Sequence, residues 1–350
     1  MTEALTAVAP GKPLREGLDR ILQANRGALI VVGDGPEVLE ICSGGFLLDA
    51  EFSPQRLSEL AKMDGAIILA PDTSRIARAN VHLVPDPSVP TAETGTRHRT
   101  AERVARSLDV PVISVSEDLA IIAVYRNWTK HQLQAIPALV NRANQALQTL
   151  ERYKVRLDTV TSSLSALEIE DLVTVRDVAA VLQRAEMVRR LAEEIDGYLV
   201  ELGEDGRMLL LQLEELMGSV NDDRRLVARD YIRPMPPDEA ASPVEMLAEL
   251  PTEELLDLER VASVLGLVNE QGELDLSLQP HGYRLLSKIP RLPHSVIDRI
   301  VAHYGSLDRA LAAAAEDDLE ELEGVGEGPA RVVREGLARL AEASMLERSP

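Results

Sequence analysis

Short runs of β-branched and other apolar residues, closed by glycine or acidic turns, constrain the fold of the first 130 residues most. These runs span residues 27–33, 66–70, 110–116 and 120–125, with a shorter one at 81–84. Runs of this length are typical of buried strands, and the segments between them repeat apolar residues at helical spacing. Because strands and helices alternate, we predict an α/β domain with a central mixed sheet, whose ligands lie where loops leave the strands.

One helix of this domain begins in an unusual cluster of donor groups. Residues 93–100 read Glu-Thr-Gly-Thr-Arg-His-Arg-Thr, and the apolar residues at 101, 104, 105 and 108 then mark one helix face. Free N–H groups and the helix dipole favour an anion at such a helix start. Two arginines there repel one another until a negative charge arrives, and a triphosphate would supply it. A solvated basic helix start explains this segment alone equally well.

An acidic residue and a glycine, Asp64 and Gly65, stand at the entry of the predicted strand 66–70. The acid can hold a divalent metal, while the glycine lets a ligand approach the backbone. Taken alone, the same dipeptide is more typical of an ordinary turn. The dipeptide gains weight only in combination with the cluster at 93–100.

From about residue 134 the pattern is helical. Apolar residues at 150, 153, 157, 160, 164 and 167 alternate steps of three and four, as in a coiled-coil seam. We therefore predict an all-α spacer over residues 149–280. This spacer holds 13 basic and 29 acidic residues, a net charge of −16 out of −21 for the chain. Such an acidic segment is a poor candidate for contact with nucleic acid, because phosphate neutralisation dominates that binding.

The tail, residues 281–350, is also predicted to be all-α, with a glycine-rich hairpin before its last helix. Glycines in the hairpin expose backbone N–H groups to a phosphate, and arginines of the following helix can pair with it. The glycines are Gly324, Gly326 and Gly328, and the arginines are Arg331 and Arg334. A hairpin of this kind grips the duplex backbone without reading bases.

Composition excludes several classes of protein. The one cysteine, Cys42, allows neither an internal disulfide nor a cysteine-based zinc site. No apolar run reaches 18 residues and the start lacks a signal pattern, so we expect a cytoplasmic protein that does not span a membrane. An aromatic content of 3% argues against recognition by base stacking. The chain also lacks a Gly-x-x-x-x-Gly-Lys-Ser/Thr loop, which argues against a helicase or an ordinary ATPase.

Together these motifs resemble the diadenylate cyclase family whose members carry a C-terminal helix-hairpin-helix domain. The stretches that carry the resemblance are LREGLDRILQANRGALIVVGDG, LAKMDGAIILA, IARANVHLVPD, ETGTRHRTAERVA, LVARDYIRP and LEGVGEGPARVVREGLARL. The resemblance implies a cyclase domain at 1–148, a helical spacer at 149–280 and a DNA-binding domain at 281–350. It also implies that two ATP molecules condense into cyclic di-AMP and two pyrophosphates between facing subunits.

The resemblance further implies roles for single residues. Asp64, Arg97, His98 and Arg99 are expected to be catalytic, and Asp64 with Glu117 is expected to hold Mg²⁺ or Mn²⁺. Asp64 is alternatively the group that takes the 3′-hydroxyl proton. The residues expected to bind ATP are Gly65, Ala66, Leu83, Thr94, Gly95, Thr96, Arg97, His98, Arg99, Thr100 and Ser116.

Assembly and DNA binding follow from the same resemblance. We expect a nucleoid-associated homo-octamer in which cyclase domains face each other, with branched DNA such as Holliday junctions sensed by the tail. One departure concerns the first tail hairpin, where Arg291 and Pro293 replace expected glycines. Because proline lacks an N–H donor and the tail's net charge is −3, the departure weakens the expected DNA binding. The alternative function is a nucleotide-sensing DNA-binding adaptor without catalysis.

Overall fold

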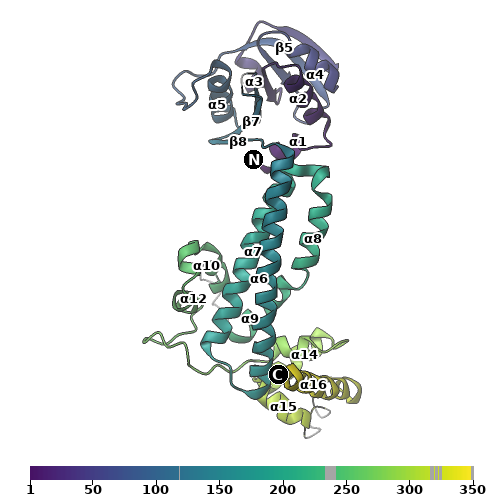
Figure 1. Ribbon diagram of the computed structural model, residues 1–350, viewed down its shortest axis with the longest axis vertical. Coiled ribbons are helices and arrows are strands. Elements are labelled where there is room, and N and C mark those ends of the chain that lie inside the picture. The colour runs from purple at the N-terminus through teal and green to yellow at the C-terminus, as the bar shows by residue number, and fades with distance from the viewer. Residues whose placement is uncertain (118, 233–241, 316–318, 320–321, 323–324, 348–350) are drawn as a thin grey trace. The chain divides into compact units, whose positions relative to one another are not determined.

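The computed structural model describes residues 1–117, 119–232, 242–315, 319, 322 and 325–347 (Figure 1). The chain divides into two compact units. One unit comprises Met1–Gln145 with Ile195–Gln212, and the other comprises Ala146–Glu194 with Leu213–Pro350. The first unit is built on a mixed sheet and the second on helices, which confirms the expected fold class. In the described part of the chain, each helix is too short or too polar to cross a bilayer.

The sheet of the first unit has the strand order β2-β5-β4-β1-β6-β7-β8, and β3 also pairs with β5. Among the described strands, β1 and β4 pair in parallel and the other neighbouring strands pair in antiparallel fashion. The strands are β1 (Ala28–Val32), β2 (Cys42–Ser43), β3 (Phe46–Glu51), β4 (Ala66–Leu69), β5 (Arg75–Leu83), β6 (Val112–Ser116), β7 (Ile121–Arg126) and β8 (Thr129–Gln132).

Helices cover both faces of this sheet, with α5 on one side and α2 and α4 on the other (Figure 1). On β1, Ile30 packs in the cluster that contains Leu18 of α2, whereas Val31 packs in the cluster that contains Val104 of α5. A strand buried on both faces must be apolar throughout, which explains its continuous apolar run. The helices are α1 (Thr2–Ala7), α2 (Pro13–Gln23), α3 (Pro36–Glu40), α4 (Pro54–Leu60) and α5 (Thr96–Leu108).

The strand register decides which loops meet. Leu29 of β1 pairs with Ala66 of β4 in parallel, and Ala28 pairs with Val115 of β6 in antiparallel fashion. Ala66 also pairs with Val81 near the end of β5. The entries of β1 and β4 and the exits of β5 and β6 therefore lie at one end of the sheet, which we call the motif end.

Three strands were not expected from the sequence, and a fourth is longer than expected. The sequence predicts a strand only at 81–84, but β5 begins at Arg75 because Arg78 and Asn80 alternate with buried neighbours. β3 carries mostly exposed side chains, β2 is two residues long and β8 is polar. Each of these three becomes a strand by pairing with β5 or β7, a cause that local sequence patterns do not reveal.

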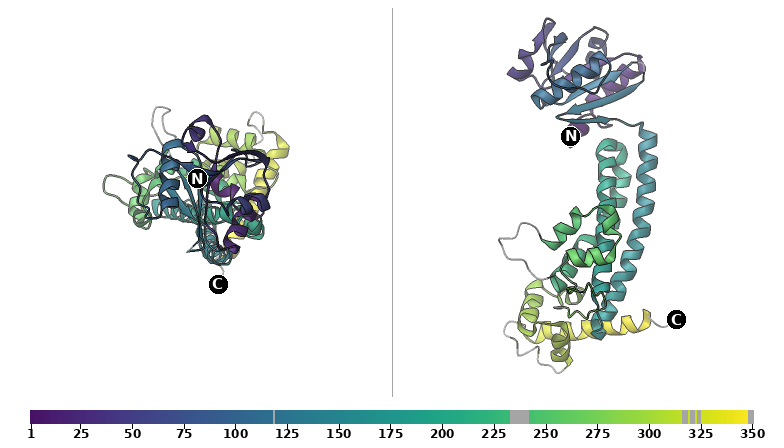
Figure 2. Two further views of the ribbon diagram at one scale, coloured as in Figure 1. Left: turned by 90° about the horizontal axis from the view of Figure 1, so that it is seen from above. Right: turned by 90° about the vertical axis from the view of Figure 1, so that its left-hand side faces the viewer.

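The long helices α6 (Ile136–Glu170) and α7 (Val175–Leu202) lie side by side (Figure 2), and the second unit is built around their residues 146–170 and 175–194. Leu150, Leu157 and Leu164 of the predicted seam are buried. The other helical elements among the described residues are η1 (Gly203–Gly206), α8 (Arg207–Met217), α9 (Val220–Tyr231), α10 (Pro243–Glu249), α11 (Thr252–Leu255), α12 (Leu258–Val264), α13 (Tyr283–Ser287), α14 (His294–Tyr304), α15 (Leu307–Ala315) and α16 (Glu327–Glu347).

A fully buried ion pair joins the tail helices to the spacer helices within this unit. Arg284 of α13 donates from Nη2 and Nε to Glu168 of α6, at 2.5 and 2.9 Å. The hydroxyl of Tyr231 donates to the same carboxylate at 2.8 Å. Next to them, Asp230 accepts backbone N–H bonds from Gly282 and the two residues after it, at 2.7–2.8 Å. The stretch Arg229–Tyr231, within the LVARDYIRP sequence, is thus an anchor for the tail.

Candidate functional site

The predicted donor cluster lies at the N-terminus of α5. Gly95 precedes the helix with extended backbone angles, and its carbonyl accepts the N–H of Arg99 at 2.9 Å. None of the described side chains caps this helix, and its first turn contains no acidic residue. The first turn therefore leaves backbone donor groups and positive charge without a capping side chain, at a helix start that the sequence predicts. The exposed members of the cluster are Thr94, Gly95, Thr96, Arg97 and Arg99, and the half-buried ones are His98 and Thr100.

The loop before α5 is folded back onto the helix. Glu102, almost fully buried, accepts the hydroxyl of Thr91 and the N–H of Ala92, the latter at 3.1 Å. The next residue, Arg103, donates from Nε to the carbonyl of Val89 at 3.0 Å. These contacts fix where the helix begins, so the donor cluster has a defined position on the sheet.

A chain of hydrogen bonds holds His98. Its Nδ1 lies 2.7 Å from Oγ of Ser114 on β6 and 3.0 Å from the hydroxyl of Tyr125 on β7. The Tyr125 hydroxyl donates to Oε1 of Glu93 at 3.2 Å, and Nζ of Lys130 donates to the same oxygen at 2.5 Å. Ser114, Tyr125 and Lys130 were not predicted from the sequence. The pairing of β6 with β7 and of β7 with β8 brings these three residues together. The sequence signal for two of them was that a polar residue interrupts an otherwise apolar run.

The surroundings fix the charge of each member of this chain. Burial lowers the pKa of His98, against the opposing effect of the Glu93 carboxylate, so the imidazole is neutral at pH 7. Burial raises the pKa of Tyr125, so its phenol keeps its proton. Burial also acts to raise the pKa of Glu93, but the hydrogen bonds from Lys130 and Tyr125 outweigh it and lower the pKa, so Glu93 is a carboxylate.

Arg97 extends from α5 to the motif end of the sheet. A Cβ built on Gly27, directly before β1, would lie 2.1 Å from Nη1 of Arg97 and 3.2 Å from the carbonyl oxygen of Val115. The guanidinium therefore rests on the backbone where β1 begins and β6 ends. Only a glycine leaves room for it there.

Asp64 and Gly65 lie at the same end, at the entry of β4. Gly65 has φ +94°, and a Cβ on it would come within 2.8 Å of the carbonyl oxygen of Val81. Asn80 donates from Nδ2 to the backbone carbonyl of Asp64 at 2.6 Å. The backbone of this turn is thus fixed against β5 while the Asp64 side chain stays exposed.

The other predicted residues of the first unit also belong to the motif end. Leu83 closes β5 and is buried, Ala66 opens β4 and is buried, and Ser116 closes β6 with Glu117 exposed directly after it. Within the described ranges, no group of three or more His, Cys, Asp or Glu side chains gathers into a metal cage. Asp64 and Glu117 each present an exposed carboxylate at this end of the sheet.

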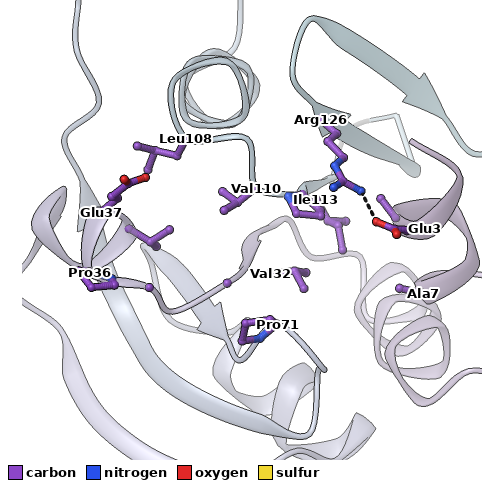
Figure 3. Close-up of a pocket in the computed structure, with 15 residues that line it drawn as sticks. Glu3, Ala7, Val32, Pro36, Glu37, Pro71, Leu108, Val110, Ile113 and Arg126 are labelled. Carbon is purple, nitrogen blue, oxygen red and sulfur yellow. Dashed lines mark hydrogen bonds and ion pairs between the residues drawn. The ribbon is translucent and has the colours of Figure 1, made fainter.

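A cavity of about 610 Å³ lies at the opposite end of the sheet (Figure 3). It opens beside Val32 at the exit of β1, Pro71 at the β4–β5 turn and Val110 before β6. Its lining is mostly apolar, with the ion pair of Glu3 and Arg126 at 2.8 Å on one side. The predicted nucleotide-binding residues are absent from its described lining, so this cavity is separate from the candidate site.

In the tail, the predicted hairpin precedes α16. Gly326 has φ +63°, Gly328 and Arg331 are exposed and Arg334 is half-buried, while Gly324 lies outside the described residues. In the first hairpin, Arg291 has φ +65°. Arginine there adopts the left-handed conformation that glycine adopts freely, at a cost of about 1–2 kcal/mol. The turn therefore keeps its shape without glycine.

Comparisons with known proteins agree with this architecture. Residues 15–129 match the family model described as "DisA bacterial checkpoint controller nucleotide-binding", and residues 133–274 match the "DisA bacterial checkpoint controller linker region". The chain is 58% identical to the DNA integrity scanning protein DisA of Frankia casuarinae, over 98% of this chain and 96% of that protein. It is 55% identical to the protein of the same name from Streptomyces coelicolor, over 99% and 94%. With a diadenylate cyclase-type nucleotide-binding domain, a helical linker and a helical tail, the chain belongs to the DisA family.

Proposed function

We propose that the chain condenses two ATP molecules into cyclic di-AMP and two pyrophosphates. Each cyclase domain holds one ATP, and two domains from different chains face each other, so that each 3′-hydroxyl meets the other nucleotide's α-phosphate. The reaction is mainly one of positioning and charge stabilisation, since nucleotidyl transfer needs little covalent chemistry from the protein.

The observation that supports this proposal best is the convergence at the motif end. The Asp64–Gly65 turn, the exit of β6 and the Arg97 guanidinium meet there from separate parts of the sequence. Arg97 and Arg99 stand at an uncapped helix N-terminus, a combination that suits a triphosphate. In a lone domain this end holds one nucleotide and no acceptor for it, so activity depends on a second copy.

Mg²⁺ or Mn²⁺ fits the residues of the motif end. Exposed Asp64 and Glu117 offer hard oxygen ligands without forming a closed cage, which is the arrangement that suits a metal arriving with the phosphates. When bound, the metal would neutralise charge that develops on the phosphate oxygens. Asp64 and Glu117 would orient it towards the nucleotide.

We further propose that the tail binds DNA backbone and couples DNA structure to cyclase activity. Exposed Gly328 and Arg331 at the start of α16 and the turn at Gly326 support this role. Branched DNA such as a Holliday junction is the proposed ligand, and a homo-octamer near the nucleoid is the proposed assembly. The net charge of −3 on residues 281–350 predicts weak binding that falls steeply with salt.

Product analysis tests the enzymatic proposal directly. Full-length protein is incubated with ATP and Mn²⁺ or Mg²⁺, and cyclic di-AMP is measured by mass spectrometry. We expect product from the wild type and none from Asp64→Asn or from the double variant Arg97→Ala with Arg99→Ala, while Arg152→Ala on the spacer serves as the matched control. A folded wild-type oligomer that binds branched DNA but makes no product would favour the adaptor function instead.

A further inference from the structure

The hydrogen bonds around His98 determine which ring nitrogen carries its proton. The carboxylate of Glu93 can only accept, and the protonated hydroxyl of Tyr125 lies 3.2 Å from it, so the hydroxyl donates to Glu93. The lone pairs of the Tyr125 oxygen then face Nδ1 of His98 at 3.0 Å. A lone pair on Nδ1 would be repelled there, so Nδ1 carries the proton. Nε2 is left with a lone pair.

Burial protects the hydrogen bonds at Nδ1 of His98 from competition by water. Ser114 and Tyr125 are 0% and 1% exposed, so water does not compete for their hydroxyl groups. Oγ of Ser114 lies 2.7 Å from Nδ1 and has lone pairs that can accept the same proton. Lys130 donates to Glu93 at 2.5 Å and keeps that carboxylate in place. The ring of His98 is thus held by its Nδ1 side.

We propose that Glu93 and Tyr125 are positioning residues that keep the proton of His98 on Nδ1, so that His98 meets the nucleotide as an acceptor through Nε2. Its partner is then a ribose hydroxyl rather than a phosphate, because phosphate esters at neutral pH offer oxygens without a proton to donate. This inference rests on the proposed cyclase function and assigns the histidine a role different from that of its two arginine neighbours.

As an acceptor, His98 would take the proton of the attacking 3′-hydroxyl group. The 3′-oxygen forms a bond to the α-phosphorus of the second ATP while the bond from that phosphorus to the pyrophosphate oxygen breaks. The hydroxyl proton passes to Nε2 of His98, and pyrophosphate leaves as an anion. The imidazolium that results is stabilised by the Glu93 carboxylate acting through Tyr125, as in other base–orienter pairs.

The first test separates turnover from ATP binding. Tyr125→Phe keeps the buried ring but removes the acceptor oxygen. We expect a kcat lowered about 10-fold, the value of one hydrogen bond at the upper end of its range, with the KM for ATP changed by less than about twofold. Tyr153→Phe on the spacer is the matched control, and we expect wild-type kinetics from it. An unchanged kcat in Tyr125→Phe would overturn the inference.

The second test uses the acid side of the pH profile of kcat, where protonation of His98 removes the acceptor. The charged groups that face His98 are Glu93, Lys130 and Arg97, with the Tyr125 hydroxyl between them. Glu93 raises the pKa of His98 and Lys130 lowers it, so Glu93→Gln should move the acid limb to lower pH and Lys130→Met should move it to higher pH. If the acid limb of the kcat profile lies at the same pH in both variants as in the wild type, the acceptor role of His98 is contradicted.

Replacement of His98 itself distinguishes an acceptor from a phosphate-binding cation. His98→Lys keeps a positive charge, so a cation role predicts retained ATP affinity and turnover, which would overturn the inference. The acceptor role predicts loss of turnover in His98→Lys, with ATP affinity lowered less than about threefold in His98→Gln, which keeps an acceptor oxygen. If the wild type makes no cyclic di-AMP, the proposed function fails; if it does and these variants behave otherwise, only this inference fails.

Discussion

The buried pair of Arg284 and Glu168 allows a sharp test of how the tail is joined to the spacer. Both side chains are 0% exposed, and the guanidinium makes two bonds to the carboxylate. In Glu168→Gln the charge of Arg284 remains buried without its partner. Breaking such a pair on one side costs about 3–5 kcal/mol of unfolding free energy, because the remaining charge is desolvated and uncompensated.

A neighbouring group places Glu168→Gln at the lower end of this range. Burial, and to a smaller extent the charge of Glu168, raises the pKa of Asp230 to about 6. Asp230 is largely ionised at neutral pH, and its carboxylate remains in Glu168→Gln to compensate part of the Arg284 charge. We therefore expect about 3 kcal/mol, which corresponds to a fall in Tm of about 6–12 °C for a unit of 150–250 residues. Arg284→Met leaves two buried acids side by side and should cost more.

Differential scanning calorimetry of the full chain measures the effect. The matched control is Glu254→Gln, which breaks the half-exposed pair with Arg260 (2.7 Å) and should cost less than about 1 kcal/mol. The double variant Glu168→Met with Arg284→Met should regain most of the loss, because hydrophobic replacement of a whole buried pair is often neutral. A Glu168→Gln protein as stable as the Glu254→Gln control would refute the reasoning.

Three further predictions concern single positions. Gly65→Ala should lose turnover and about 1–2 kcal/mol of stability or more, measured by thermal unfolding, because φ is +94° and the new Cβ meets the backbone of Val81. Gly27→Ala should lower ATP affinity about 10- to 100-fold in calorimetric titration, with little change in the free energy of unfolding. The new Cβ displaces the flexible end of Arg97, and with it the charge-assisted bond that Arg97 is proposed to donate to a phosphate of ATP. Asp230→Asn should remove a pH dependence. The raised pKa means that Asp230 stabilises the fold fully below about pH 4 and loses that contribution as pH rises to about 6, by roughly 1.4 kcal/mol per pH unit. Urea unfolding between pH 4 and 7 should show a wild-type slope that the variant lacks, and equal slopes would count against this assignment.

Sequence patterns predicted the buried strands well because burial on both faces forces a continuous apolar run. β1 and β4 are completely buried, and each was recognisable from five or more apolar residues. β8, with the sequence Thr-Lys-His-Gln, offered no such signal, because only its hydrogen bonds to β7 make it a strand. The seam at Leu150, Leu157 and Leu164 was predictable for the same reason as β1, since burial imposes its spacing.

The candidate site was predictable only in part. The glycine and charged residues at 64–65 and 93–100 stand out because they interrupt apolar patterns. The environment of His98 could not be predicted from the sequence. Ser114 and Tyr125 are polar interruptions of two apolar strands, and only the β6–β7 register shows that both contact His98. The role of Gly27 was hidden too, since only the reach of Arg97 from another element explains it.

The division of the sheet into a motif end and an opposite end has a practical consequence for protein engineering. The β4–β5 turn at 71–74 lies at the opposite end, with Asp72 accepting the N–H and hydroxyl of Ser74 at 3.0 and 2.7 Å. Exposed turns of this kind tolerate insertions and new chain termini best. A fluorescent reporter or a circular-permutation site between Asp72 and Thr73 would leave every strand pairing at the motif end continuous. The same insertion in the loops after β5 or β6 would cut through the site.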